Sequence, residues 1–162
     1  MAVTAATLTT TVGESITLNG KTYGNTITKT HASVKIVREQ IITVPNDALV
    51  ILYEAADSAS GQTFDEDLIV YARVTNTDTS NFIGLHIITD TGQEAIYKLN
   101  AGCTFVLNAH ADAFDTEDDV SDANPDITAE DFSSATGNDI VKISADANTA
   151  SVDVEVLIAA TG

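Results

Sequence analysis

The 162-residue sequence contains no Trp, a single Cys, only seven Lys and Arg residues, and no long apolar run. With Cys103 alone, an internal disulfide bond is excluded. The scarcity of cations argues against nucleic-acid binding, which depends on clustered Lys and Arg side chains. A formal charge of −17 would also be repelled by anionic membrane surfaces, and no segment approaches the roughly 20 apolar residues of a membrane-spanning helix. We therefore expect neither nucleic acid nor a membrane among the partners.

The N-terminal stretch "MAVTAATLTT" has neither a cationic start nor an apolar run, which excludes an ordinary secretion signal. We therefore expect a protein that is made in soluble form inside a cell, in the cytoplasm. A hydrophobic fraction of 44% is ordinary for a globular protein, and 162 residues suit one domain. We expect a single domain over 1–162, with 1–12 as an N-terminal arm or a frayed end and 112–131 as an acidic loop.

Thr, Val and Ile are abundant, and they favour strands because branched side chains suit a pleated surface. Roughly nine or ten short strand patterns follow one another at the spacing that is typical of an antiparallel sandwich or barrel. Asn19-Gly20 is the strongest hairpin signal. No segment has a convincing helical period, and 128–135 offers one helical turn at most. The sequence thus predicts an all-β fold, an antiparallel β-sandwich.

Three parts of the chain allow more specific predictions. In 33–44, "SVKIVREQIITV", Arg38 and Gln40 interrupt an apolar face, which predicts a bend or a strand that leaves the sheet partway. The segment 48–55, "ALVILYEA", is apolar on both faces and predicts a central strand. In 68–75 and in the final strand, the side chains expected to share one face are Leu68, Val70, Ala72 and Val74, and Val152, Val154, Val156 and Ile158, the second set facing inward.

The most acidic stretch is 112–131, "DAFDTEDDVSDANPDITAED", in which nine of twenty residues are Asp or Glu. An EF-hand calcium loop requires Gly at its sixth position and Glu at its twelfth, where this chain has Val120 and Asp126. A solvated surface loop is therefore favoured over an ion site, and a loop of this length is suited to contact a partner. The carboxylates that would serve a calcium ion if one bound are Asp115, Glu117, Asp119 and Asp126.

No segment carries a recognisable catalytic, cofactor-binding or metal-binding motif. His31, His86 and His110 lie on separate segments without zinc-ligand spacing, and a satisfied sheet histidine is the favoured interpretation of His86. Cys103 alternates with apolar residues and is expected to be a small core residue rather than a nucleophile. Paired carboxylates for glycoside hydrolysis are no better than chance in so acidic a chain without Trp. We assign no catalytic, cofactor or metal residues and expect a protein that is not an enzyme.

The segment 71–109 carries a recognisable pattern. Residues 73–82 have the form R-V-T-N-x-D-x-x-N-F, and residues 98–107 have the form K-L-x-x-G-x-x-F-x-L. This pattern resembles small virion proteins of tailed bacteriophages, especially marine ones. The runs "ESITLNGKTYGNTITKT" (14–30) and "ADANTASVDVEVLIA" (145–159) are similar to the same group, so the resemblance covers most of the chain. Its motifs are turn-and-strand patterns rather than chemical signatures, and 112–131 departs most from the group.

The group is similar to capsid decoration, or cement, proteins, which are typically β-sandwiches of jelly-roll type that sit as trimers on the phage head. The resemblance implies a jelly-roll-like fold, a homotrimer, the major capsid protein as partner, and a place on the capsid surface of the virion. A head-fibre base or a tail or neck component of the virion is the alternative. A calcium-dependent adhesin or carbohydrate-binding module is an alternative of another class, against which the absence of Trp counts.

Overall fold

A computed structural model describes residues 4–56, 64–65, 68–89, 92, 94–108 and 140–161. Over these residues the chain forms thirteen strands and no α-helix. The helical turn considered at 128–135 and the acidic stretch 112–131 lie outside the described residues. The strands are β1 (Ala6–Gly13), β2 (Ile16–Leu18), β3 (Lys21–Tyr23), β4 (Thr26–Val34), β5 (Ile36–Val44), β6 (Val50–Ala56), β7 (Phe64–Asp65), β8 (Ile69–Asn76), β9 (Ile83–Thr89), β10 (Glu94–Leu99), β11 (Thr104–Leu107), β12 (Ile140–Ala147) and β13 (Val152–Ala160).

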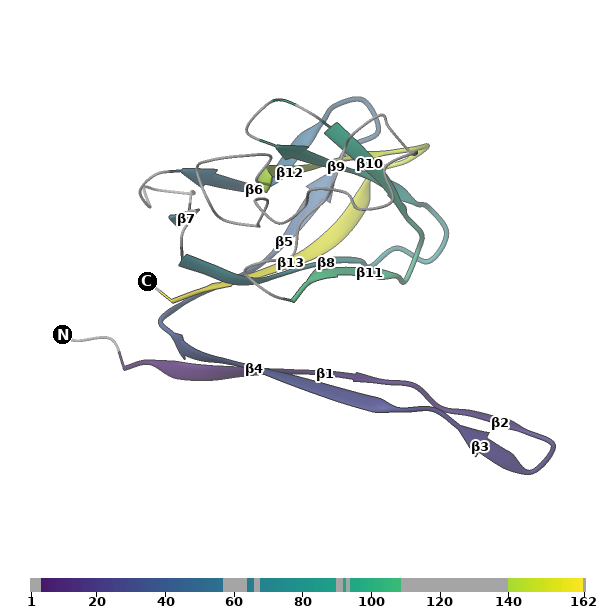
Figure 1. The fold of residues 1–162 in the computed structure, drawn as a ribbon. Coiled ribbons are helices and arrows are strands. Elements are labelled where there is room, and N and C mark those ends of the chain that lie inside the picture. The colour runs from purple at the N-terminus through teal and green to yellow at the C-terminus, as the bar shows by residue number, and fades with distance from the viewer. Residues whose placement is uncertain are drawn as a thin grey trace, which may run out of the picture.

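The body of the molecule consists of two packed sheets with the strand orders β11-β8-β13-β5 and β10-β9-β12-β6-β7 (Figure 1). If the two-residue strand β7 is set aside, the pairing is nested. The first body strand pairs with the last (β5 with β13), and inside that pair β6 meets β12, β8 meets β11 and β9 meets β10, all antiparallel. Nested antiparallel pairs shared between two four-stranded sheets are the topology of a jelly roll. The prediction of an all-β antiparallel sandwich is confirmed.

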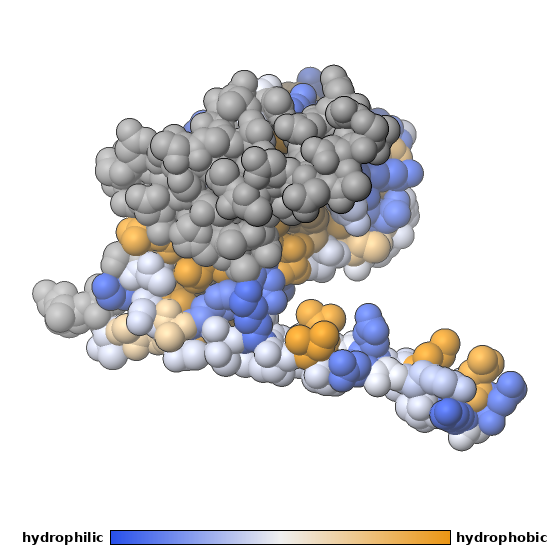
Figure 2. All heavy atoms as spheres, viewed as in Figure 1, coloured by the Kyte–Doolittle hydropathy of each residue, from blue (hydrophilic) through white to orange (hydrophobic). Residues whose placement is uncertain are grey.

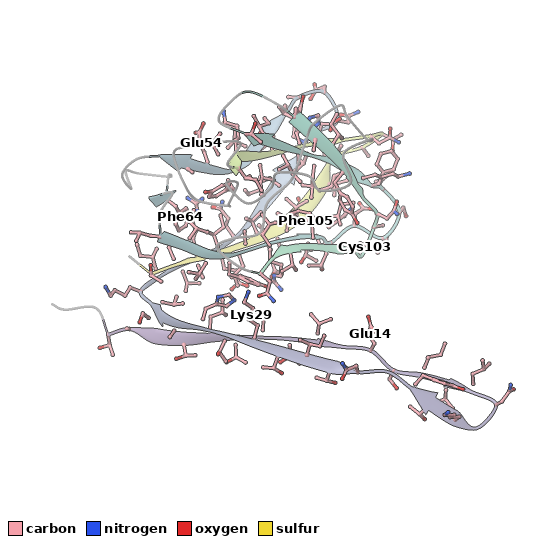
Figure 3. All side chains as sticks on the ribbon, in the orientation of Figure 1. Glu14, Lys29, Glu54, Phe64, Cys103 and Phe105 are labelled. Atoms are coloured by element: carbon pink, nitrogen blue, oxygen red, sulfur yellow. The ribbon has the colours of Figure 1, made fainter. Side chains whose placement is uncertain are left out.

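The core lies between the two sheets and is almost entirely aliphatic. Along β13 the predicted alternation is confirmed, because Val152, Val154, Val156 and Ile158 are at most 1% exposed. Phe64 and Phe105 project into the space between the sheets, where they pack on this core (Figure 3). The body therefore has the continuous hydrophobic core of an independently stable domain.

Strand β8 departs from the predicted face pattern at Val70. The ladder with β13 shifts by one residue between Ile69 and Tyr71, so that Val70 is the extra residue of a bulge. A bulge interrupts the two-residue alternation of a strand. As a result Ile69 joins Ala72 and Val74 in the core, whereas Val70 packs on the outer side of the sheet. The prediction was correct for Ala72 and Val74 and wrong for Val70.

The bend predicted at Arg38 and Gln40 lies a few residues earlier, at Lys35. Strand β4 ends at Val34, and β5 then runs unbroken from Ile36 to Val44. The Arg38 guanidinium lies 4.6 Å from the ring centroid of Phe64, a cation–π contact that lets this charged side chain point inward. The polar interruption therefore does not end the strand.

Strand β6 lies between β12 and the two-residue β7. It pairs with β12 over residues 50–54 and with β7 only over residues 55–56, so the prediction of a central strand holds only in part. Leu52 and Tyr53 are buried, whereas Ile51 is half exposed. The apolar residues on both faces of this segment thus predicted that both faces would be buried, which does not hold at Ile51.

A long β-hairpin, which we call the arm, projects along and beyond the outer face of one sheet (Figure 1). Strand β1 pairs with β4, and β2 pairs with β3 at the far end. The arm considered over 1–12 is thus the first strand of a hairpin whose strands extend from residue 6 to residue 34. Because the described residues pair neither edge of this hairpin with the body, it forms a two-stranded ribbon of its own.

Candidate interaction surface

The base of the arm packs on the outer face of the sheet β11-β8-β13-β5. Val34 at the end of β4 forms a small buried cluster with Tyr71 of β8 and Ala159 of β13, and Leu8 of β1 packs against it. His31, only 8% exposed, places its ring 6.3 Å from that of Tyr71. The sheet therefore carries hydrophobic contacts on both faces at this point, one toward the core and one toward the arm.

Asn108, directly after β11, holds both strands of the arm. Thr10 Oγ1 donates a hydrogen bond of 2.9 Å to Asn108 Oδ1, and His31 Nε2 lies 3.2 Å from the same oxygen. Around this contact a groove of about 340 Å³ lies between residues 8–12 of the arm and the sheet, where Asn108, Val106 and Leu157 line it. The arm is thus fastened at its base and separates from the sheet toward its tip.

The tip of the arm is formed by residues that tolerate unusual backbone angles. Asn19 (φ 51°) and Gly20 (φ 77°) form the two-residue turn between β2 and β3, which confirms the predicted hairpin. Gly24 adopts φ 149°, and a Cβ at this position would lie 1.9 Å from the carbonyl oxygen of Glu14. Only glycine therefore allows the two strands to approach each other at this point.

The arm has two faces of different character. Its cross-strand pairing keeps one register from the Leu8–His31 pair to the tip, so alternate pairs lie on the same face. The face turned away from the body is rich in threonine and contains the pairs Thr9–Thr30, Thr11–Thr28 and Thr17–Thr22. The inner face, which begins with the buried pair at the base, contains Leu8–His31, Thr10–Lys29, Val12–Ile27, Ile16–Tyr23 and Leu18–Lys21.

Beyond the base, the apolar side chains of the inner face have no cover. Figure 2 shows hydrophobic side chains rising from the arm on the side of the body, midway and again near the tip. They are between 49% and 65% exposed, and burying such a half-exposed side chain contributes about 1 kcal/mol. A two-stranded hairpin is at best marginally stable in water without a third strand or another element to pack on. We call this set the distal inner face: Val12, Ile16, Leu18, Tyr23 and Ile27.

The first 35 residues, which comprise the arm and Lys35 after it, carry a charge opposite to that of the rest of the chain. Residues 1–35 contain three of the seven Lys and Arg residues but one of the 24 Asp and Glu residues, a formal charge of +2. Residues 36–162 contain the other four cations and 23 acids, a formal charge of −19. Lys29 lies on the side of the arm that faces the body (Figure 3), and Lys21 lies over the Tyr23 ring near the tip. The apolar distal inner face is therefore flanked by cations.

On the same outer sheet face, next to the strip that the arm covers, strand β5 leaves apolar side chains exposed. Val37 is 60% and Ile41 71% exposed, and Glu39 lies between them on this face. Glu155 of β13 is the cross-strand neighbour of Ile41, and Arg73 forms ion pairs with both Glu39 and Glu155. We call Val37, Glu39 and Ile41 the β5 strip, an apolar surface with an acidic border.

His86 lies on the other sheet, where two carboxylates flank it. Its Nδ1 contacts Glu94 of β10, and its Nε2 lies 2.8 Å from Oδ1 of Asp146 on β12. Partial burial lowers the pKa of His86, but the hydrogen bonds and charges of Asp146 and Glu94 outweigh this effect and raise the pKa above its ordinary value. A Cβ on Gly84 would lie 2.6 Å from Asp146 Oδ1, so glycine leaves room for this contact. His86 is thus a satisfied sheet histidine.

The remaining candidate residues do not gather into a site. Cys103 is exposed at the turn before β11, so the prediction of a core position was wrong: the strand begins one residue later, and Cys103 precedes it. In the described parts of the chain no cluster of three or more His, Cys, Asp or Glu side chains is arranged to hold a metal ion. The remaining candidates lie outside the described residues: His110, Asp115, Glu117, Asp119 and Asp126.

Sequence reasoning missed the distal inner face, although two signals were available. Val12, Ile16 and Leu18 alternate with polar residues in the same way as a strand of the core, so their pattern does not distinguish an arm from the body. The charge distribution does: cations cluster in residues 21–35, whereas acids occupy the rest. The second signal is the repeated threonines at the positions that alternate with these apolar residues, a pattern that indicates a ribbon with one solvent-exposed face.

Comparison of the chain with protein-family models, with curated proteins and with solved structures finds no match. In the described residues there is also no helix with the length and apolar character needed to cross a membrane. The geometry itself therefore defines the candidate site, which consists of the distal inner face and the β5 strip.

Proposed function

We propose that this protein is a non-enzymatic structural component of a bacteriophage virion, a decoration protein bound to the outer surface of the capsid. The observation that carries the proposal is the union of a jelly-roll body with an arm whose apolar face is uncovered in a single copy. A protein whose role is adhesion needs such contact surfaces and no reaction centre. The turn-and-strand pattern of 71–109 supports the same conclusion through its resemblance to small virion proteins.

The physical properties suit a protein that is present in many copies. A formal charge of −17 keeps the protein soluble and discourages random association before assembly. On the capsid, a homotrimer docked on the major capsid protein would bind through several simultaneous contacts, so that modest contacts add up to strong attachment. The negative outer surface would also discourage decorated heads from adhering to one another.

The test is to compare virions made with and without this protein. Mass spectrometry should give a copy number close to that of the major capsid protein, and electron microscopy should show bare positions on the head when the protein is missing. Heads without it should release their DNA at lower temperature. A low copy number together with density missing from the tail or neck would replace decoration with the alternative virion role, and particles with no copies would contradict both.

A further inference from the structure

We propose that the distal inner face of the arm packs on a second copy of this chain, against the β5 strip. The inference deepens the proposed function by naming the contact that joins copies, and it rests on that function for its biological setting. Its test uses the purified protein without capsids, so that either conclusion can fail independently of the other.

The first step is that the arm requires a partner. From Val12 to the turn at Asn19, the hairpin continues for about 23 Å at the usual rise per residue of a strand. Over this length its inner face is uncovered and apolar except at Glu14, which lies between Val12 and Ile16 on the same face, and its opposite face is threonine-rich (Figure 3). A ribbon of two strands without a packing layer is only marginally stable. The distal inner face therefore has the composition of a surface that becomes buried on assembly.

The second step identifies the partner by its charge. Residues 1–35, the arm together with Lys35, carry a formal charge of +2 and the other residues carry −19, so copies repel each other unless the arm of one meets the acidic part of another. On the inner face the cations are Lys21 and Lys29. The β5 strip and its border supply Glu39 and Glu155, two carboxylates that share one cation, Arg73. Complementary charge of this kind sets the register of an interface and accelerates association.

The third step places the contact on the body. The base of the arm already packs on the outer face of the sheet β11-β8-β13-β5 through Tyr71 and Ala159. Val37 is the cross-strand neighbour of Ala159 on the same face, and it remains exposed together with Ile41. A neighbouring arm laid on this strip would extend the layer that the chain's own arm begins. Because donor and acceptor surfaces differ, each copy offers its arm to a neighbour and accepts an arm on its own β5 strip, and such contacts form a closed ring when the rotation between copies closes.

The experiment measures the mass of the full-length protein by size-exclusion chromatography with light scattering. Wild type should have at least twice the monomer mass of 17.0 kDa. Ile27→Asp on the distal inner face should give the monomer mass, whereas the adjacent Thr28→Asp, on the opposite face of the same strand, should leave the wild-type mass unchanged. Ile41→Asp on the β5 strip should also give the monomer. Unchanged thermal unfolding of the body would show that each variant is folded.

Mixing the variants distinguishes a specific arm contact from general stickiness. Ile27→Asp retains an intact β5 strip and Ile41→Asp retains an intact arm, so an equimolar mixture should form a dimer through the one remaining interface. A monomeric wild type, an oligomer that persists in Ile27→Asp, or a mixture that stays monomeric would each overturn the proposal. Arm-dependent binding to isolated capsid protein by a monomeric wild type would assign the arm to the capsid instead.

Discussion

The body and the arm are both made of β-strands, yet they are stabilised in different ways. In the body, side chains such as Val154 and Ile158 are completely buried between two sheets. In the arm, Val12 and Ile27 face each other across the strands and remain more than half exposed. The same local pattern of alternating residues thus produces a self-sufficient domain in one region and, in the other, a ribbon that depends on what it contacts. Burial, not strand propensity, separates the two.

The largest difference is expected for truncation of apolar side chains. Leu85→Ala should reduce the free energy of unfolding of the body by about 2–5 kcal/mol, because Leu85 is completely buried in the core. Ile27→Ala on the arm should change it by less than about 0.5 kcal/mol, as for a surface substitution. Urea unfolding at a concentration where the protein is monomeric measures both. Equal losses would mean that the arm is part of the cooperative unit of the body.

The next largest effect is expected at Gly24. Gly24→Ala introduces a Cβ in contact with the Glu14 carbonyl and places a non-glycine residue at φ 149°, so it should destabilise the tip locally by about 1–3 kcal/mol. Amide hydrogen exchange of residues 14–25 should accelerate while the melting temperature of the body stays constant. Gly92→Ala is the control. Gly92 also has a positive φ but lies in the body, and a Cβ added there would have no atom within 4 Å, so this substitution should leave the arm unaffected.

A smaller effect is expected at the contact between the two regions. Asn108→Ala removes the oxygen that Thr10 and His31 approach, so the base of the arm should loosen by about 1 kcal/mol per hydrogen bond lost. Hydrogen exchange should accelerate in residues 28–32 before it changes in the core strands. If exchange in the arm stays at the wild-type rate, the hydrophobic cluster around Tyr71 holds the base without the help of Asn108.

The smallest expected effect is on the pH dependence of stability, and it concerns His86 in the body. Because the pKa of His86 is raised in the folded state, protonation of this ring stabilises the fold. This contribution is fully present below the unfolded value of about 6.5 and is lost as pH rises through the folded pKa. Asp146→Asn should lower the pKa in an NMR titration of His86, without altering self-association. An unchanged titration would mean that Asp146 does not interact with the ring.

Much of the body could be predicted from the sequence, and much of the interaction surface could not. Clean alternation in β13 and the Asn19-Gly20 turn each depend on local residues, so both were correctly predicted. The bulge at Val70 depends on the register with another strand, which no local pattern encodes. The exposed faces of β1 and β5 depend on what packs over them, and alternation alone gives no information about that.

The central claim is that a neighbouring copy, and not the chain's own body, protects the distal arm. Hydrogen exchange of the wild-type protein, followed by mass spectrometry across a dilution series, tests it most directly. Amides in residues 12–27 should be protected at high concentration and should lose that protection on dilution, while β8, β12 and β13 keep theirs throughout. Protection of 12–27 that is independent of concentration, whether strong or absent, would contradict the account.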